Sequence, residues 1–213
     1  MKKRIDIHDF QDRLQRAEDM VRKRNPISDR NAELIESFEQ SCITEGLSKA
    51  RISKYVLGLK KLANWLGKDF DKVDKKDIEK LVNGLEKREE YSAWTKHDYK
   101  VTVKRFYKWL KGGGEDYPAE VKWIKTTMRQ KDILLPSDIL TEEEIRKIVD
   151  AAYNPRDKAF IMSLYESGAR VGEIGSMHIG DVVFEENYAR LMLRGKMGSR
   201  RVIVIAATPY LNR

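Results

Sequence analysis

Apolar residues recur at spacings of three and four over most of this sequence, and they change to alternate positions only after residue 181. The first spacing places apolar side chains on one face of a helix, whereas alternation places them on one face of a strand. Ile52, Val56, Leu59 and Ala63 are a typical helical stripe. We therefore expect a mainly α-helical protein with one small antiparallel sheet near its C-terminal end.

Residues 31–131 are expected to form one domain of four helices with short connections. Ser48, Asp74 and Ser92 each precede an apolar stripe and are of the types that cap helix N-termini. The predicted helices run from Asn31 to near Gly46, from Ser48 to Leu66, from Asp74 to Leu85 and from Ser92 to Leu110.

Residues 1–30 are expected to form a helical arm, with a helix at 8–24 that Pro26 ends. Apolar residues are sparse in this helix. The sequence therefore leaves open whether the arm packs on the next domain, packs on a partner chain or stays frayed.

A linker is expected at 132–139, because Pro136 disfavours helical angles in the residue before it. The second domain, 140–213, begins with a capping box formed by Thr141 and Glu144. A nearly all-apolar helix follows Asn154-Pro155 and is expected to be central; Gly168 ends it, and a short helix follows at 170–177. The predicted strands are 182–184, 188–194 and 201–205.

Positive charge is concentrated in the first part of the chain. The net charge is +8 with a pI near 9.4, and residues 132–213 carry 11 basic and 12 acidic residues, so the excess lies before them. This balance favours a polyanionic partner, with nucleic acid first and an acidic membrane surface second. Two predicted helices, 48–66 and 92–110, each have a basic side that could contact phosphates, although such sides are often only solvated surface. The candidate DNA-binding residues are Lys49, Arg51, Lys54, Lys96, Lys100, Lys104 and Arg105.

Several other classes of site find no support in the sequence. Cys42 is the single cysteine and is expected in the core, and the three histidines are too scattered for a metal site. No phosphate-binding glycine loop for nucleotides occurs, and no apolar run approaches a membrane span. We expect a cytoplasmic protein without a membrane segment; its richness in Lys, Arg and Glu favours a thermophilic source.

Arg170 is the strongest candidate for chemistry. It follows a helix end and a glycine in Ser167-Gly168-Ala169-Arg170-Val171-Gly172-Glu173, and its guanidinium could grip two phosphate oxygens. Glu173 lies one helical turn later and could hold the arginine in place. On spacing alone, a routine surface ion pair is the alternative.

Lys196 lies between Gly195 and Gly198 in a basic hairpin. An ammonium group there could donate a proton to a leaving oxygen, and the alternative is a lysine that only decorates a polar turn.

These parts, in this order, resemble the tyrosine recombinases of the phage and archaeal integrase family, and archaeal members most closely. The resemblance rests on Asn154–Ile174, with Ser-Gly-Ala-Arg-Val-Gly-Glu-Ile, and on the Gly-Lys hairpin. It implies an N-terminal SAM-like four-helix core-binding domain followed by the first part of an α+β catalytic domain. It also implies that Arg170 contacts the scissile phosphate, that Lys196 is a general acid and that Glu173 supports them. The family's cycle passes through a 3′-phosphotyrosyl intermediate, needs no cofactor or metal, and is run by tetramers on double-stranded DNA.

The family's His-x-x-Arg motif and nucleophilic tyrosine do not occur in this sequence. Tyr210 lies close to the hairpin, lacks the expected preceding motif and is interpreted as a surface or terminal residue. We therefore expect the N-terminal portion of a recombinase that binds DNA for integration or recombination but does not cleave it alone. The alternative is a non-catalytic DNA-binding or regulatory protein on the same scaffold.

Overall fold

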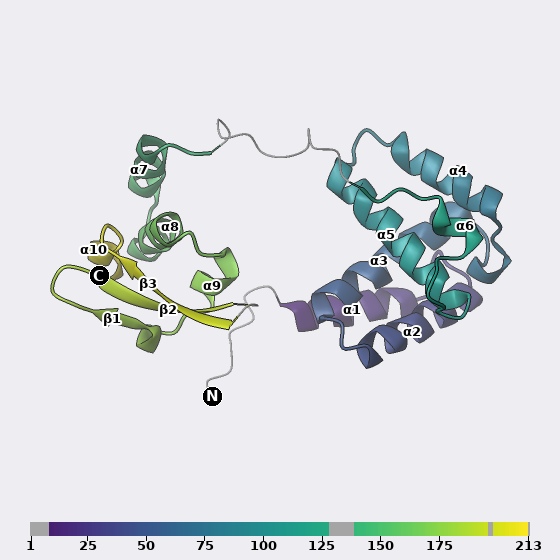
Figure 1. Cartoon of the computed structure of the whole chain (residues 1–213), viewed down its shortest axis with the longest axis horizontal. Coiled ribbons are helices and arrows are strands. Elements are labelled where there is room, and N and C mark those ends of the chain that lie inside the picture. The colour runs from purple at the N-terminus through teal and green to yellow at the C-terminus, as the bar shows by residue number, and fades with distance from the viewer. Residues whose placement is uncertain (1–8, 128–138, 196–197, 213) are drawn as a thin grey trace. The chain divides into compact units, whose positions relative to one another are not determined.

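Helices α1 to α6 form one structural unit, and helices α7 to α10 form a second unit together with a three-stranded sheet (Figure 1). The computed structural model describes residues 9–127, 139–195 and 198–212. The expected linker lies outside these ranges except for Ile139, and so does Lys196. The predicted fold class, mainly helical with one small antiparallel sheet, is confirmed.

The four expected helices of the first unit form close to their predicted bounds. The side chains of Asp74 and Ser92 accept hydrogen bonds from the third residue of their helices, as their sequence context predicted. Ser48 occupies the cap position of its helix without a side-chain bond, so only its position was predicted correctly. The elements are α1 (Phe10–Arg22), α2 (Asp29–Thr44), α3 (Lys49–Leu66), a 3-10 turn (Phe70–Lys72), α4 (Lys75–Glu86), α5 (Ala93–Leu110) and α6 (Ala119–Lys122).

Aromatic side chains fill the centre of this unit. Phe106 meets Phe38 edge-on with ring centroids 5.4 Å apart, and it meets Phe70 at 4.7 Å. The hydroxyl of fully buried Tyr107 donates a hydrogen bond to the Phe70 carbonyl oxygen at 3.2 Å. Cys42 is buried in the same core, as expected. Such ring pairs add stability beyond the area they bury, so the unit has a well-specified core.

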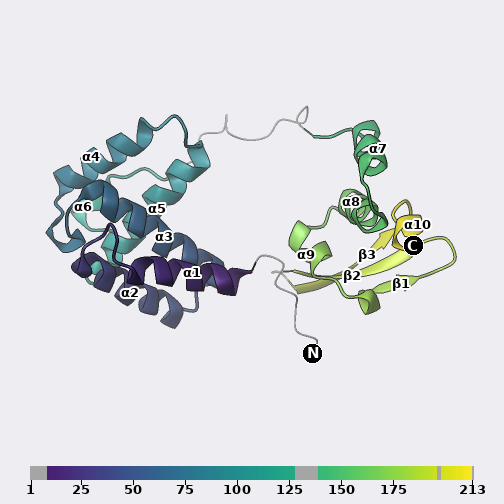
Figure 2. The same ribbon diagram turned by 180° about the vertical axis from the view of Figure 1, so that it is seen from behind.

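Helix α1 packs on the helices that follow it (Figure 2). Leu14, Ala17 and Val21 are buried and belong to the same core as the side chains of α2 and α3. Of the alternatives that the sequence left open for this helix, the structure therefore selects packing on the next helices.

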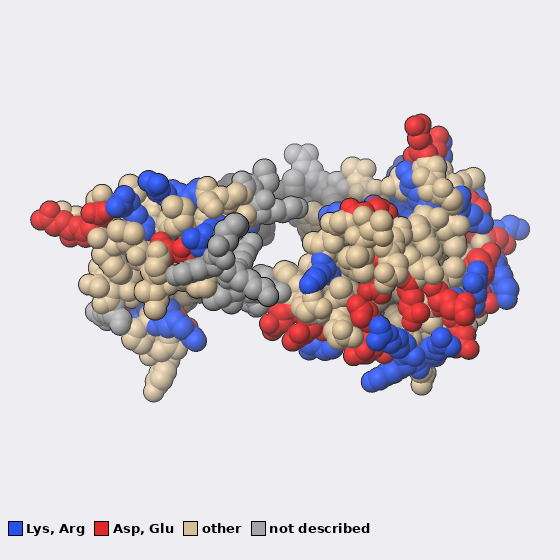
Figure 3. All heavy atoms as spheres, turned by 90° about the horizontal axis from the view of Figure 1, so that it is seen from below, with Lys and Arg blue, Asp and Glu red and all other residues tan. Residues whose placement is uncertain are grey.

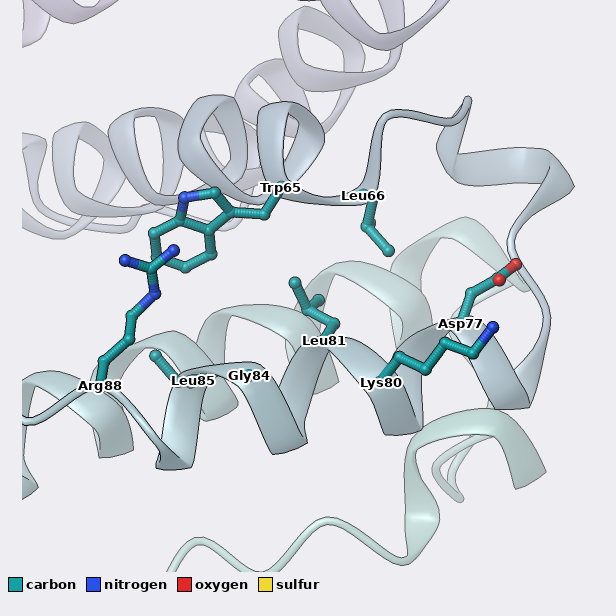
Figure 4. Close-up of a pocket in the computed structure, with 8 residues that line it drawn as sticks. All are labelled: Trp65, Leu66, Asp77, Lys80, Leu81, Gly84, Leu85 and Arg88. Atoms are coloured by element: carbon teal, nitrogen blue, oxygen red, sulfur yellow. The ribbon is translucent and has the colours of Figure 1, made fainter.

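A shallow depression of about 440 Å³ lies between the end of α3 and α4 (Figure 4). The Arg88 guanidinium lies 4.4 Å from the centroid of the Trp65 ring and closes one end of it. The guanidinium is attracted to the face of the ring. This contact joins Arg88, two residues after the end of α4, to the last turn of α3.

The second unit is a small α+β arrangement. Thr141 and Glu144 form the predicted capping box, Asn154 caps α8, and Gly168 ends α8 with a left-handed φ of 57°. The elements are α7 (Glu142–Ala151), α8 (Pro155–Ser167), α9 (Val171–Gly175), a 3-10 turn (Ile179–Asp181), β1 (Val182–Phe184), β2 (Ala189–Gly195), β3 (Gly198–Val204) and α10 (Thr208–Leu211). The sheet is antiparallel in the order β1-β2-β3, and α10 was not predicted.

Helix α8 is less buried than its apolar sequence predicted. Within the described unit, only Met162 and Ser163 of this helix are buried, and Tyr165 is exposed. The expectation that α8 is central was therefore wrong. The physical reason is that the described elements pack against one side of this helix, while three side chains of β2, Ala189, Leu191 and Leu193, are fully buried in the core.

Glu166 fixes the end of the sheet. Its carboxylate accepts three backbone N–H groups, from Ile205 at 2.6 Å, Ala206 at 3.1 Å and Ala207 at 2.8 Å. These donors lie where β3 ends and α10 begins, so one side chain of α8 satisfies the turn between them.

Candidate phosphate site and basic groove

Arg170 stands at the start of α9, two residues after the left-handed glycine that ends α8. Its backbone is extended at this position, and its side chain is 70% exposed. The chain reversal at Gly168 thus presents a guanidinium to solvent at a helix start, as the sequence predicted.

Glu173 holds Arg170 from the first turn of α9. Its carboxylate accepts a hydrogen bond from the backbone N–H of Arg170 at 3.0 Å and a second from Nη1 at 3.3 Å. Glu173 is only 2% exposed, so this pair is not the routine surface ion pair that spacing alone allowed. A buried acceptor fixes the arginine more firmly than an exposed one, because water competes less for it.

Arg200 on β3 makes the strongest contact to Glu173. Its Nη1 and Nη2 atoms donate to the two carboxylate oxygens at 3.0 and 2.8 Å. These bonds, followed by the bond from the Arg170 amide, lower the pKa of Glu173 from 4.5 to about 2. Arg200 was not among the predicted site residues. Its position on the inward face, opposite buried Leu193, is the signal that could have identified it.

Gly195 is required by this arrangement. A β-carbon at this position would overlap Oε1 of Glu173 and would lie 3.1 Å from its Cδ. The backbone of β2 therefore passes directly against the buried carboxylate, and glycine is the residue that permits this approach.

A second ion pair fastens the other strand of the hairpin. Arg194 on β2 donates to Asp181 at 2.6 and 2.8 Å, and the carboxylate also accepts the His178 backbone N–H at 2.9 Å. The His178 amide, followed by Arg194, lowers the pKa of Asp181. Each strand of the hairpin thus carries an arginine that is bound to a buried carboxylate.

The arrangement suits the binding of a phosphate rather than a metal. One Nη of Arg170 is bound to Glu173, which leaves the outward donors of its planar fork for an anion. Three charges meet here, two guanidinium groups and one carboxylate, so the cluster is net positive. Among the described residues, no group of three histidine, cysteine or carboxylate side chains could hold a metal ion.

The predicted DNA-binding residues separate into two sets. On α3, Arg51 and Lys54 are exposed beside a groove of about 990 Å³ between α3 and α5. Lys54 reaches across to Asp98 on α5 at 3.2 Å, with both side chains largely in solvent. Lys49 is also exposed and bonds to Gln11 of α1. Figure 3 shows one face of the molecule, on which basic and acidic side chains of the first unit intermingle.

The basic residues of α5 are partly occupied within the unit. Lys100 is 19% exposed and pairs with Glu86 at 2.5 Å, while Lys96 donates to the carbonyl oxygen of the same residue at 2.6 Å. Lys104 donates to the Ile124 carbonyl at 3.1 Å, and Arg105 pairs with Glu45. The free positive surface of the groove is consequently richer on α3 than on α5.

Trp94 is exposed, and Tyr210 is half-buried. Trp94, in the first turn of α5, is 60% exposed, and its ring lies in a T-shaped arrangement with that of His97, with centroids 5.9 Å apart. Tyr210, interpreted from sequence as a surface residue, is half-buried in α10 against the core of the second unit.

Comparison with known proteins identifies both units. Residues 138–211 match the phage integrase family, and residues 35–114 match the phage integrase N-terminal SAM-like domain. Tyrosine recombinase XerA of Pyrococcus horikoshii is 31% identical over 185 residues, which cover 84% of this chain and 58% of that protein. Tyrosine recombinase XerD of Bifidobacterium longum is 29% identical over 191 residues, which cover 80% and 59%. The chain spans less than two thirds of the length of these relatives.

Solved structures show the same fold. The XerH site-specific recombinase bound to difH substrate in a pre-cleavage complex aligns with 95% of this chain and 66% of its own, with a TM-score of 0.56 and 18% identity. The post-cleavage complex of XerH with a palindromic difH substrate aligns with 99% and 70%, with a TM-score of 0.59 and 18% identity. Within the residues the structure describes, no helix has the length and apolar character needed to cross a membrane.

Proposed function

This chain belongs to the phage integrase family, and we propose that it binds duplex DNA and carries the first part of the strand-cleavage site of a site-specific recombinase. The observation that carries this proposal is Arg170, an exposed guanidinium anchored on a carboxylate that is 2% exposed. An anchored fork of this kind can grip a phosphodiester with little loss of side-chain freedom on binding.

In this proposal Arg170 contacts the scissile phosphate and Glu173 supports it. Lys196, on the hairpin whose two strands are fastened by Arg194 and Arg200, protonates the leaving 5′ oxygen. The chemistry would need no metal or other cofactor, since a 3′-phosphotyrosyl link conserves the energy of the phosphodiester. In the complete enzyme we propose a tetramer on two duplexes.

The groove between α3 and α5 is the proposed DNA surface. Residues 31–131 carry 22 basic and 16 acidic residues, so the unit attracts a polyanion. The exposed cations Arg51, Lys54 and Lys61 follow α3 at spacings of three and seven, which places them along one face of the helix. Contacts from such a face to phosphates fix the register of a protein on a duplex.

DNA affinity measured against salt concentration tests the binding step. Fluorescence anisotropy of a labelled 30-base-pair duplex should give a log–log slope whose magnitude falls by about 2 in the double variant Arg51→Gln/Lys54→Gln, with about tenfold weaker binding. The matched control, Lys76→Gln/Lys87→Gln, removes the same charge from two exposed positions outside the groove, one on α4 and one directly after it. Equal losses in both double variants, or an affinity independent of salt, would refute this surface.

A further inference from the structure

Glu173 has more partners than an arginine anchor requires. It binds Arg170 through two N–H groups, and it binds Arg200 through a bidentate pair that joins residues 27 positions apart. Arg200 lies 44% exposed, and both of its terminal nitrogens are engaged with the carboxylate. Its fork is therefore directed at Glu173, while the fork of Arg170 is only partly used.

The pair between Arg200 and Glu173 changes the net charge beside Arg170. A carboxylate paired with Arg170 alone would neutralise that guanidinium, and an arriving phosphate would have to compete with it. Arg200 shares the carboxylate and leaves the three groups with a net charge of +1. It also keeps the carboxylate ionised and oriented, since a bidentate pair restricts both partners to one plane.

The same pair ties the hairpin to the arginine. Gly195 passes against the Glu173 carboxylate from β2, and Arg200 reaches the same carboxylate from β3. Both strands thus meet α9 at one side chain. The distance between Arg170 and the hairpin is therefore set at Glu173, and it depends on Arg200.

We propose that Arg200 is a positioning residue of the phosphate site, which orients Glu173 and thereby Arg170 without itself touching the phosphate. This inference rests on the proposed function, because it assigns a role within the phosphate site that the proposal places at Arg170.

Nuclear magnetic resonance of the whole chain tests the inference, with inorganic phosphate as the probe. The carboxyl signal of Glu173 gives its pKa, and the Nε–H signals of Arg170 and Arg200 report phosphate binding. In Arg200→Lys, which keeps the charge but loses the bidentate fork, we expect the pKa of Glu173 to rise by one or more. The affinity of Arg170 for phosphate should fall three- to tenfold.

The matched control is Arg201→Lys. Arg201 is the next residue of β3, is exposed on the other face of the strand and forms no ion pair within the described residues. This variant should leave the pKa of Glu173 and the phosphate affinity unchanged. Circular dichroism checks that each variant keeps the fold of the unsubstituted chain.

Three results would overturn the inference. These are an unchanged pKa of Glu173 in Arg200→Lys, an Nε–H shift of Arg200 as large as that of Arg170, and an ordinary Glu173 pKa near 4.5 in the unsubstituted chain. The last needs no variant, so it decides the question even if Arg200→Lys does not fold. If phosphate does not shift the Arg170 Nε–H signal of the unsubstituted chain, the phosphate site of the proposed function is refuted. The pKa of Glu173 then still shows whether Arg200 orients that carboxylate.

Discussion

Replacing Glu173 by glutamine tests the central carboxylate of the site. The pKa of Glu173 lies at about 2 instead of 4.5, which corresponds to ~3 kcal/mol of stabilisation at neutral pH. The partners Arg170 and Arg200 are 70% and 44% exposed, so water screens part of this interaction. We therefore expect Glu173→Gln to destabilise the second unit by about 1–2 kcal/mol at pH 7.

The stabilisation by the Glu173 carboxylate should decrease in acid. Because the pKa is lowered in the folded state, the stabilisation is complete above the unfolded value of 4.5 and is lost as pH falls toward 2. The difference between the unsubstituted chain and Glu173→Gln should thus be constant above about pH 5 and should shrink steadily in more acidic solution.

Hydrogen exchange provides the assay, because it reads the two units separately. Amides of the central strand β2, such as those of Leu191 and Leu193, should exchange about 5- to 30-fold faster in Glu173→Gln. All four tryptophans lie in the first unit, at positions 65, 94, 109 and 123, so the tryptophan fluorescence transition should not move.

Glu186→Gln is the matched control, since this glutamate is exposed in the turn between β1 and β2. If both variants leave exchange in β2 equally fast at pH 7, the stabilising role of the buried carboxylate is refuted. A difference that persists undiminished at pH 2 would equally contradict the reasoning, because Glu173 would then not be the group that titrates.

Three further outcomes are expected. Gly195→Ala should destabilise the second unit by about 1–3 kcal/mol, because the added methyl group forces the Glu173 carboxylate aside. Gly84→Ala is the control: this glycine faces open space on α4, and the substitution should stabilise that helix by about 0.5–1 kcal/mol. Equal effects of the two substitutions in thermal unfolding would contradict the close approach of Gly195 to Glu173. Burial, followed by repulsion from Glu18, raises the pKa of Glu39 to about 7. The contribution of Glu39 to stability is therefore fully present below pH 4.5 and is lost as pH rises through 7. Glu39→Gln should stabilise the first unit at pH 8, by about 1–3 kcal/mol in urea unfolding, and have little effect at pH 4. Trp94 is exposed and directly precedes Thr95, which lines the groove, so we expect its ring to contact the sugar-phosphate backbone of a bound duplex. Trp94→Ala should therefore weaken duplex binding about fivefold. Trp123→Ala should not, because the indole N–H of Trp123 is bonded to the Glu120 carbonyl oxygen, and equal affinities of the two variants would contradict a role of Trp94 in binding.

Local signals in the sequence predicted most of the fold. The caps at Asp74, Ser92, Thr141 and Asn154 act within three or four residues of their own position, so their chemistry can be read from neighbours in the chain. The change of apolar period near residue 182 likewise located the sheet.

The contacts that complete the candidate site are not local. The Glu173–Arg200 pair depends on the register of β3, and a shift of one residue would turn Arg201 toward α9 instead. In the same way, the pairing of Lys100 with Glu86 and of Arg105 with Glu45 removes charge from a helix face that looked free in the sequence. Apolar composition also overstated the burial of α8, because burial depends on which neighbours cover each side.

Because Glu166 binds three backbone amides at the end of the sheet, the carboxylate at position 166 is required there, whereas the side chains of two of its partners are not. Ile205 and Ala206 are exposed and offer only their N–H groups to the carboxylate. Every amino acid except proline supplies that group. Evolution is consequently free to change the chemical identity of these two positions, and with it the outward character of this corner, as long as residue 166 keeps its carboxylate.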